Sequence, residues 1–209
     1  MIILSQDPSF THLSYSLKED NNIYMNTINL SLGENIGFDK IFNSIMYIWD
    51  EYKKSLDAIG VGSKIKIDKL ISEIPPPVGN FSAGLYALDT FIIYKLISTY
   101  TSINEVYIVS PSYLGTIHGT SKYKKSDSTK LAKYFIEEVF NNNYNIIIPD
   151  SISKTGRKTK GKLNNDKAES FLFLLRLMCK FNIDDKENMI KSEMSGLGYE
   201  AEKLLFKRN

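Results

Sequence analysis

Cysteine and histidine are scarce in this chain of 209 residues. The single cysteine, Cys179, excludes an internal disulfide and a cysteine-rich zinc site, and we expect it in the core because it follows an apolar run. The two histidines, His12 and His118, are too far apart in sequence for the paired-histidine motif of zinc proteases. The sequence therefore predicts neither a disulfide scaffold nor a zinc-protease centre.

Long apolar runs are also absent, and the net charge is small. No stretch approaches the roughly 20 apolar residues of a membrane-spanning helix, and the N-terminus lacks the basic region of a signal peptide. We therefore expect a soluble, cytoplasmic protein. The 26 Lys and Arg residues nearly balance the 24 Asp and Glu residues, for a formal charge of +2. This balance excludes a uniformly basic protein that coats nucleic acid.

The hydrophobic pattern changes period along the chain. Short apolar or alternating segments predict three antiparallel strands in the first 30 residues, further strands at residues 65–74 and 106–109, and a brief extended run at residues 146–148. Apolar residues at helical spacing predict helices at residues 38–58, 82–100, 127–140 and 166–180. The order of these elements predicts an α/β fold: a mixed five-stranded sheet, with three antiparallel strands and then parallel ones, and helices on both faces.

Acidic residues lie at the ends of these predicted elements. Asp7 follows the first strand, Glu73 ends the strand at 65–74, and Asp166 and Glu169 share one face of the last helix. Carboxylates are the ligands that magnesium prefers, and two such ions are a common device for phosphodiester hydrolysis. The alternatives are structural: Asp7 in a turn, Glu73 at a solvated strand end, and Asp166 as a helix N-cap with Glu169 in a capping box.

Three short motifs around these acids resemble those of RuvC-type Holliday junction resolvases. They are an apolar strand followed by Asp7-Pro8-Ser9, the strand Ile71-Ser72-Glu73-Ile74, and Asp166-Lys167-Ala168-Glu169-Ser170-Phe171-Leu172. The likeness covers about residues 1–180 and is closest to the small phage-encoded members. The chain departs from the common pattern at Gln6, at Glu169 in place of Asp, and in the run Pro75-Pro76-Pro77.

The resemblance implies a ribonuclease-H-like nuclease domain at residues 1–182, and we expect a helical tail at residues 183–209. It implies a homodimer that cleaves branched DNA with magnesium, or with manganese as a substitute. Asp7, Glu73, Asp166 and Glu169 occupy the positions that bind two metal ions in this family. The helix at 82–100, with its large apolar surface, corresponds to the helix at the family's dimer interface; the alternative is a helix packed only on its own sheet.

Positive charge is concentrated in two stretches. Residues 151–163 carry +5 and residues 113–133 carry +4, so the rest of the chain sums to −7. Such segregation favours sequence-independent contact with DNA phosphates, although solvated loops are the alternative. The predicted DNA-binding residues are Lys122, Lys124, Lys125, Lys154, Arg157, Lys158, Lys160 and Lys162.

These patterns favour a metal-dependent, structure-selective endodeoxyribonuclease that resolves four-way and other branched junctions by paired nicks. Lys160 or Lys162 would neutralise the scissile phosphate. Two alternatives stay open at this point. One is a non-catalytic protein that binds branched DNA on the same fold. The other is a ribonuclease H-like hydrolase of RNA–DNA hybrids.

Overall fold

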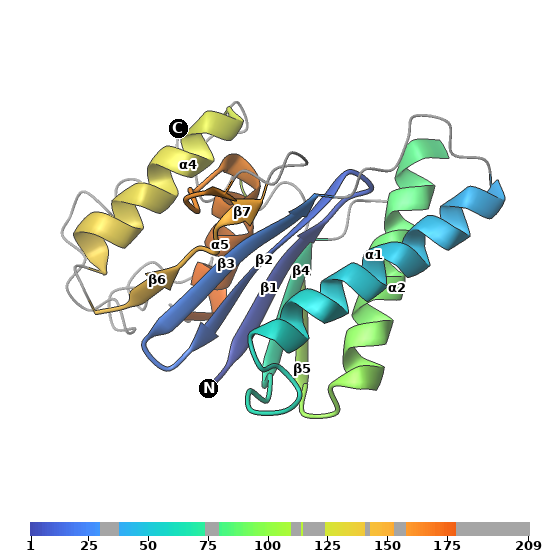
Figure 1. Ribbon diagram of the computed structural model, residues 1–209, viewed down its shortest axis with the longest axis horizontal. Helices are drawn as coiled ribbons and strands as arrows, with labels where there is room; N and C mark the ends of the chain where they lie inside the picture. Colours follow the sequence, from blue (N-terminus) through green and yellow to red (C-terminus); the bar gives the residue numbers. More distant parts are fainter. Residues whose placement is uncertain are drawn as a thin grey trace.

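The computed structural model describes residues 1–29, 38–73, 80–109, 114, 124–140, 143–152 and 158–178. Its centre is a twisted sheet with helices packed on both faces (Figure 1). This is the α/β architecture that the alternation of strand and helix periods predicts. The expected tail at residues 183–209 and Cys179 lie outside the described residues.

The first three strands form an antiparallel meander, as expected. β1 (Ile3–Pro8) pairs with β2 (His12–Glu19), and β2 pairs with β3 (Asn22–Asn29). On the other side of β1, β4 (Lys69–Glu73) and β5 (Glu105–Val109) are added in parallel. β1 therefore lies in the interior of the sheet, where its apolar residues are covered on both faces.

The sheet has six strands rather than the expected five. β6 (Asn145–Ile147) pairs in parallel with β3, which gives the order β5-β4-β1-β2-β3-β6. A separate hairpin of β7 (Ser151–Ile152) and β8 (Lys158–Thr159) was not expected either. The strand expected from residue 65 begins only at Lys69, because Ile65 instead forms an isolated bridge with Val61.

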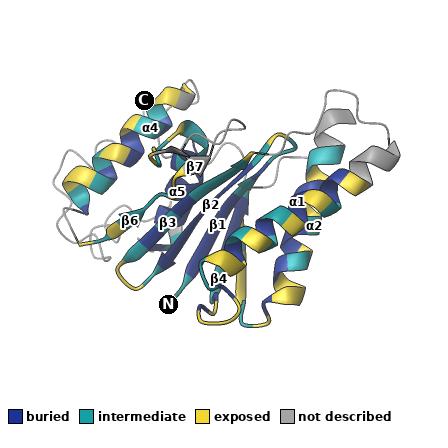
Figure 2. Ribbon diagram, viewed as in Figure 1, coloured by how far each residue is buried: buried dark blue, intermediate teal, exposed yellow. Residues whose placement is uncertain are grey.

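Helices α1 (Phe38–Ala58) and α2 (Asn80–Thr99) cover one face of the sheet. Their buried residues recur at helical spacing and appear as dark stripes that face the strands (Figure 2). They pack with the even-numbered residues of β1 and β4, such as Leu4 and Leu70. The buried apolar residues of the two helices are Ile45, Ile48, Trp49, Tyr52, Leu56, Leu88, Ile92, Ile93 and Leu96.

The other face is covered by α4 (Lys125–Tyr134), its π-helical continuation η1 (Phe135–Val139), and α5 (Asn165–Met178). Their core includes Phe135 and Phe171, which pack with Ile3 and Ile71 of the sheet. The odd-numbered residues of β1 and β4 therefore face α5. Among the described residues, the structure contains no helix with the length and apolar character needed to cross a membrane.

Candidate functional site

Asp7 and Glu73 lie side by side at the carboxyl ends of neighbouring parallel strands. Gln6 of β1 is in register with Ser72 of β4, so the next residues along, Asp7 and Glu73, are adjacent. Ile3 and Ile71 belong to the core on the α5 face, and side chains alternate along a strand. Both carboxylates therefore belong to the α5 face of the sheet.

Gln6, which departs from the family pattern, is directed to the opposite face. Its amide Nε2 donates to Ser72 Oγ at 3.1 Å, and both side chains are fully buried. Gln6 therefore links β1 to β4 on the face of the sheet opposite the carboxylates, and it does not add a ligand group to them.

Three serines set the position of α5 on the sheet. Ser5 Oγ donates to the carbonyl oxygen of Ser170 at 2.6 Å, and Ser16 Oγ lies 2.9 Å from Ser170 Oγ. Small side chains at these buried positions let the helix approach the strands closely. From Ser170 back to Asp166 is about 6 Å along the helix, and from Ser5 to Asp7 is about 7 Å along the strand. Because these two lengths are similar, Asp166 lies at about the same position along the strand direction as Asp7.

The first turn of α5 is capped by Asn164, not by Asp166. The backbone N–H of Lys167 donates to Asn164 Oδ1 at 2.9 Å, which is the N-cap geometry. The capping alternative for Asp166 and Glu169 is therefore wrong. Asp166 lies in the first turn, where the helix dipole favours a negative charge, and Glu169 is 5% exposed.

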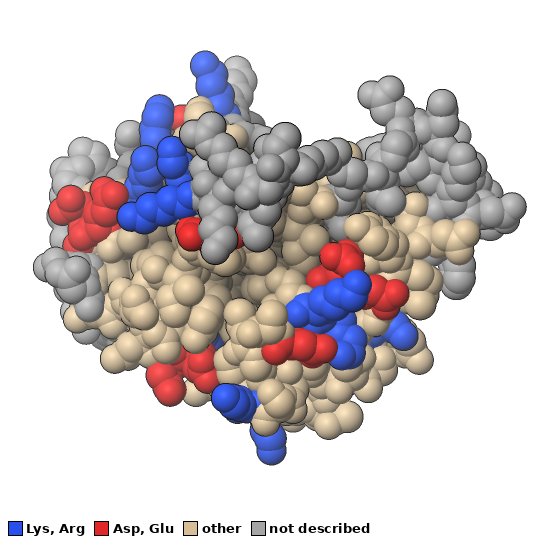
Figure 3. Space-filling model, viewed as in Figure 1, with Lys and Arg blue, Asp and Glu red and all other residues tan. Residues whose placement is uncertain are grey.

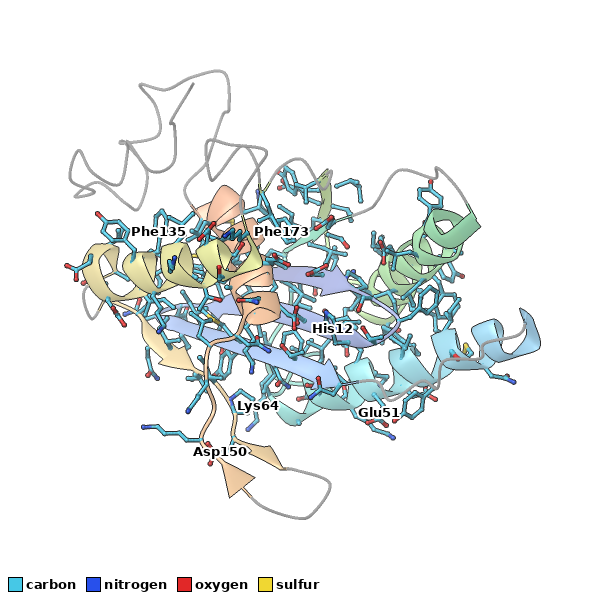
Figure 4. The ribbon with its side chains drawn as sticks, turned by 90° about the horizontal axis from the view of Figure 1, so that it is seen from above. His12, Glu51, Lys64, Phe135, Asp150 and Phe173 are labelled. Carbon is cyan, nitrogen blue, oxygen red and sulfur yellow. The ribbon has the colours of Figure 1, made fainter. Side chains whose placement is uncertain are left out.

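His12 contacts Asp166 directly. Its Nε2 lies 3.2 Å from Asp166 Oδ1, and the two side chains are 28% and 22% exposed. His12 begins β2 immediately after the turn that follows Asp7 and Pro8. This contact connects the first turn of α5 to the start of β2, and Figure 4 labels His12 at this position.

Asp89 of α2 is a further carboxyl group close to the site. It is 1% exposed, and its Oδ1 has no hydrogen-bond partner among the residues that the structure describes. Burial raises the pKa of Asp89 to about 9, and the negative charges of Asp7 and Glu73 add to the shift. Asp89 is therefore protonated at neutral pH, and the site has an excess of negative charge for which a cation would compensate.

The donor set suits a hard divalent cation. Asp7, Glu73, Asp166 and Glu169 offer only carboxylate oxygens, the ligands that magnesium and manganese prefer. Within the described part of the chain, no three Asp, Glu, His or Cys side chains are already gathered closely enough to hold an ion. The side chains of the four acids would have to rotate toward one another for an ion to bind.

The basic side chains begin immediately beside α5. The Lys167 ammonium group donates to the carbonyl oxygen of Lys162 at 3.1 Å, which ties the segment before α5 to its first turn. Burial lowers the pKa of Lys167, and the charge of Asp166 opposes this shift. Lys124, Lys160 and Lys162 are exposed, as phosphate contacts require.

The remaining predicted DNA-binding residues are described only in part or not at all. The backbones of Lys125 and Lys158 lie in α4 and β8, and their side chains are outside the description. Lys122, Lys154 and Arg157 lie outside the described residues. In Figure 3, basic side chains gather over the α4 side of the molecule, whereas acidic and basic side chains are mixed over α1.

Sequence reasoning did not select His12, Asp89 or Lys167 for the site. Asp89 had a signal, because it is the sole acid in an otherwise apolar helix. The sequence signal for His12 was weaker. A short hairpin after Asp7 returns the chain to the same edge of the sheet, so the first residue of the second strand lies near Asp7. Lys167 had only its place between Asp166 and Glu169.

No known family model matches the chain, and no curated protein matches it at a significant level. Among solved structures, it is similar to one described as Thermus thermophilus RuvC in complex with Holliday junction substrate. The TM-score is 0.52 at 10% identity, over 84% of this chain and 91% of the other. A second match, described as Thermus thermophilus RuvC structure, has a TM-score of 0.48 at 11% identity, over 84% and 92% of the two chains.

The chain has the ribonuclease-H-like fold of RuvC. The junction-bound match carries this conclusion, because it extends over most of both chains. The expected ribonuclease-H-like fold is thus confirmed, with β6 as an additional strand. At this level of identity the similarity concerns the fold, and function is argued from the site.

Proposed function

We propose that this protein is a metal-dependent, structure-selective endodeoxyribonuclease that resolves four-way (Holliday) and other branched DNA junctions by paired nicks. The observation that carries the proposal is the adjacency of Asp7 and Glu73 on the face of the sheet against which α5 brings Asp166 and Glu169. A solved protein of the same fold is described in complex with a Holliday junction substrate, which supports this choice of substrate.

The four carboxylates would hold two magnesium ions, with manganese as the substitute ion. The ions would supply Lewis-acid chemistry, by activating water and stabilising the leaving oxyanion. Asp7 and Glu73 would bind from the sheet, and Asp166 and Glu169 from α5. Attack in line with the leaving oxygen would give a product with a 5′-phosphate.

The lysines around the site would bind the DNA backbone. Lys160 and Lys162 are exposed on the segment that joins the β7–β8 hairpin to α5, and one of them would neutralise the scissile phosphate. The hairpin projects from the body of the molecule (Figure 4), so it would reach DNA bound across the α5 face. Lysine contacts to phosphate give affinity for DNA without sequence specificity.

A homodimer would match the two-fold symmetry of a four-way junction. α2 buries one face against the sheet, while Tyr86, Tyr94 and Ile97 remain exposed on it. Val106 and Ile108 of the edge strand β5 are also exposed, and their alternation with Tyr107 puts them on the face that α2 covers. We propose that this apolar surface of α2 and β5 is the dimer interface.

The motifs quoted from the sequence further support a relation to the small phage-encoded resolvases. On this proposal the protein acts in DNA recombination and repair, in the cytoplasm of a host cell if a phage encodes it.

Cleavage assays on four substrates test the proposed function. A four-way junction, a flap, a plain duplex and an RNA–DNA hybrid are incubated with the protein and magnesium. We expect symmetric nicks in the four-way junction, less cleavage of the flap and none of the plain duplex. Cleavage of the hybrid alone would identify a ribonuclease H-like hydrolase instead, and binding without any cleavage would identify a non-catalytic junction-binding protein.

A further inference from the structure

The backbone of His12 is hydrogen-bonded into the turn at the edge of the carboxylate site. The backbone N–H and the hydroxyl of Ser9 both donate to the His12 carbonyl oxygen, at 2.9 and 2.6 Å. The backbone N–H of His12 donates in return to Ser9 Oγ at 3.1 Å. These contacts close the turn between β1 and β2, and they fix where the backbone of His12 lies relative to Asp7.

The imidazole lies on the same face of the sheet as the acids. Ser14 is paired with Asp7 across β1 and β2, and Ser16 contacts Ser170 of α5. His12 precedes Ser14 by two residues, so alternation puts its side chain on the α5 face as well. The contact with Asp166 confirms this direction.

We propose that His12 is a nitrogen ligand of the metal ion that Asp166 binds, which raises the affinity of that one position for manganese relative to magnesium. The inference rests on the proposed function and adds a ligand to its metal site. Ligand atoms lie about 2.1 Å from such an ion, so neighbouring ligands of an octahedral site are about 3.0 Å apart. The 3.2 Å between His12 Nε2 and Asp166 Oδ1 suits two ligands of one ion.

The second ring nitrogen of His12 has a partner that suits this role. Nδ1 lies 2.9 Å from Thr11 Oγ1, a hydroxyl that can accept the Nδ1–H. A ligand histidine usually donates its other ring N–H to such an acceptor, and this leaves the Nε2 lone pair for the ion. The geometry of both ring nitrogens therefore agrees with metal coordination.

The nitrogen ligand would change which ion the site prefers. Magnesium demands oxygen ligands and near-ideal octahedral geometry, whereas first-row transition ions accept imidazole together with carboxylates. Replacing His12 by Gln should therefore lower manganese affinity by roughly tenfold while magnesium affinity changes little. Titration calorimetry of the full-length chain with each ion alone measures both changes.

Pulsed electron paramagnetic resonance of bound manganese gives a direct test. In the wild-type protein, electron spin echo modulation should show a histidine nitrogen coupled to the ion, and ¹⁵N-labelled histidine should shift that signal. His118→Gln removes the only other histidine and should keep the signal. His12→Gln should lose it, and melting of the metal-free variants checks that each is folded.

The outcomes separate this inference from the proposed function. If manganese binds to the wild type, is lost in Asp7→Asn, and shows no histidine nitrogen, the role of His12 is wrong and the carboxylate site stands. If the signal survives in folded His12→Gln, the ligand is also wrongly assigned. If neither manganese nor magnesium binds to the wild type, the metal site of the proposed function fails together with this inference.

Discussion

Asp89 is held in its protonated form by its surroundings. It is buried next to an apolar core, and Asp7 and Glu73 add negative charge nearby. An unfolded aspartic acid loses its proton near pH 4, so between about pH 4 and 9 only the folded state carries a proton there. Folding stability should therefore fall as the pH rises through this window, and stop falling above it.

Asp89→Asn should remove this pH dependence. The amide keeps the size of the acid without an ionisable proton, so the variant should exceed the wild type in stability by a few kcal/mol, at about pH 8. Urea denaturation at pH 5 and pH 8 measures the difference. Asp50→Asn, at an exposed site on α1, is the control and should leave the wild-type pH dependence intact. A wild type equally stable at both pH values would contradict the account.

The β7–β8 hairpin depends on a glycine at its base. The backbone N–H of Gly161 donates to Asp150 Oδ1 at 3.0 Å, and a Cβ at this position would lie 2.2 Å from the carbonyl oxygen of Ile148. A backbone oxygen cannot move aside as the end of a side chain can. Gly161 therefore allows the chain to pass closely over the end of β6 before it enters α5.

Gly161→Ala should destabilise the protein by roughly 1–3 kcal/mol, because the added methyl group forces the segments apart. Gly84→Ala is the matched control. A Cβ at Gly84, inside α2, would meet the Phe10 ring at 3.6 Å, an ordinary contact. There alanine should stabilise the helix by up to about 1 kcal/mol. Urea denaturation of both variants measures the difference, and equal stability of the two would show that the close approach is not real.

Charge reversal at Lys160 and Lys162 tests the basic segment. The double change to Glu should weaken junction binding and reduce the steepness of its salt dependence by about two units, one for each lost phosphate contact. The control is the same double change at Lys64 and Lys66, which are equally exposed and equally spaced before the start of β4, away from the site. Filter binding over a salt series measures both, and equal effects would argue against a local DNA-binding surface.

The helices and the first strands could be predicted because each presents many residues to one face. α1 begins and ends where its apolar period predicts, since six apolar residues recur at helical spacing between Ile41 and Leu56. β6 has three residues and β7 two. The sequence indicates a brief extended run where β6 lies, but segments this short carry too little alternation to be placed in the sheet. Pairing of β6 with β3 joins segments more than 110 residues apart, which no local pattern encodes.

The acids of the candidate site could be selected from sequence because each ends or begins a recognisable element. Their common face follows from strand alternation and from the register of β1 with β4, which only the structure supplies. The N-cap at Asn164 and the contact of His12 with Asp166 depend on how α5 is seated on the sheet. That seating comes from Ser5, Ser16 and Ser170, three residues with no distinctive local signal.

Paired nicks in a two-fold symmetric junction require two copies of the protein with opposed sites. Tyr94 is 65% exposed on α2, and Ile97 lies beside it on the same helix. The double change Tyr94→Glu and Ile97→Glu should convert a dimer to a monomer, because charges would be buried in an apolar interface. Sedimentation velocity measures the change. Lys133→Glu on α4, on the other side of the sheet, should leave the dimer intact.

In the proposed function, the carboxylates around Asp7 hold the divalent metal ions with which the protein cuts branched DNA. Asp7→Asn keeps the size of the side chain and removes its charge. The most direct measurement is cleavage and binding of one labelled four-way junction by wild type and Asp7→Asn, with magnesium and with excess chelator. We predict paired nicks only for the wild type with metal, and equal junction affinity for both proteins. Undiminished cleavage by Asp7→Asn, or by the wild type in chelator, would contradict the account.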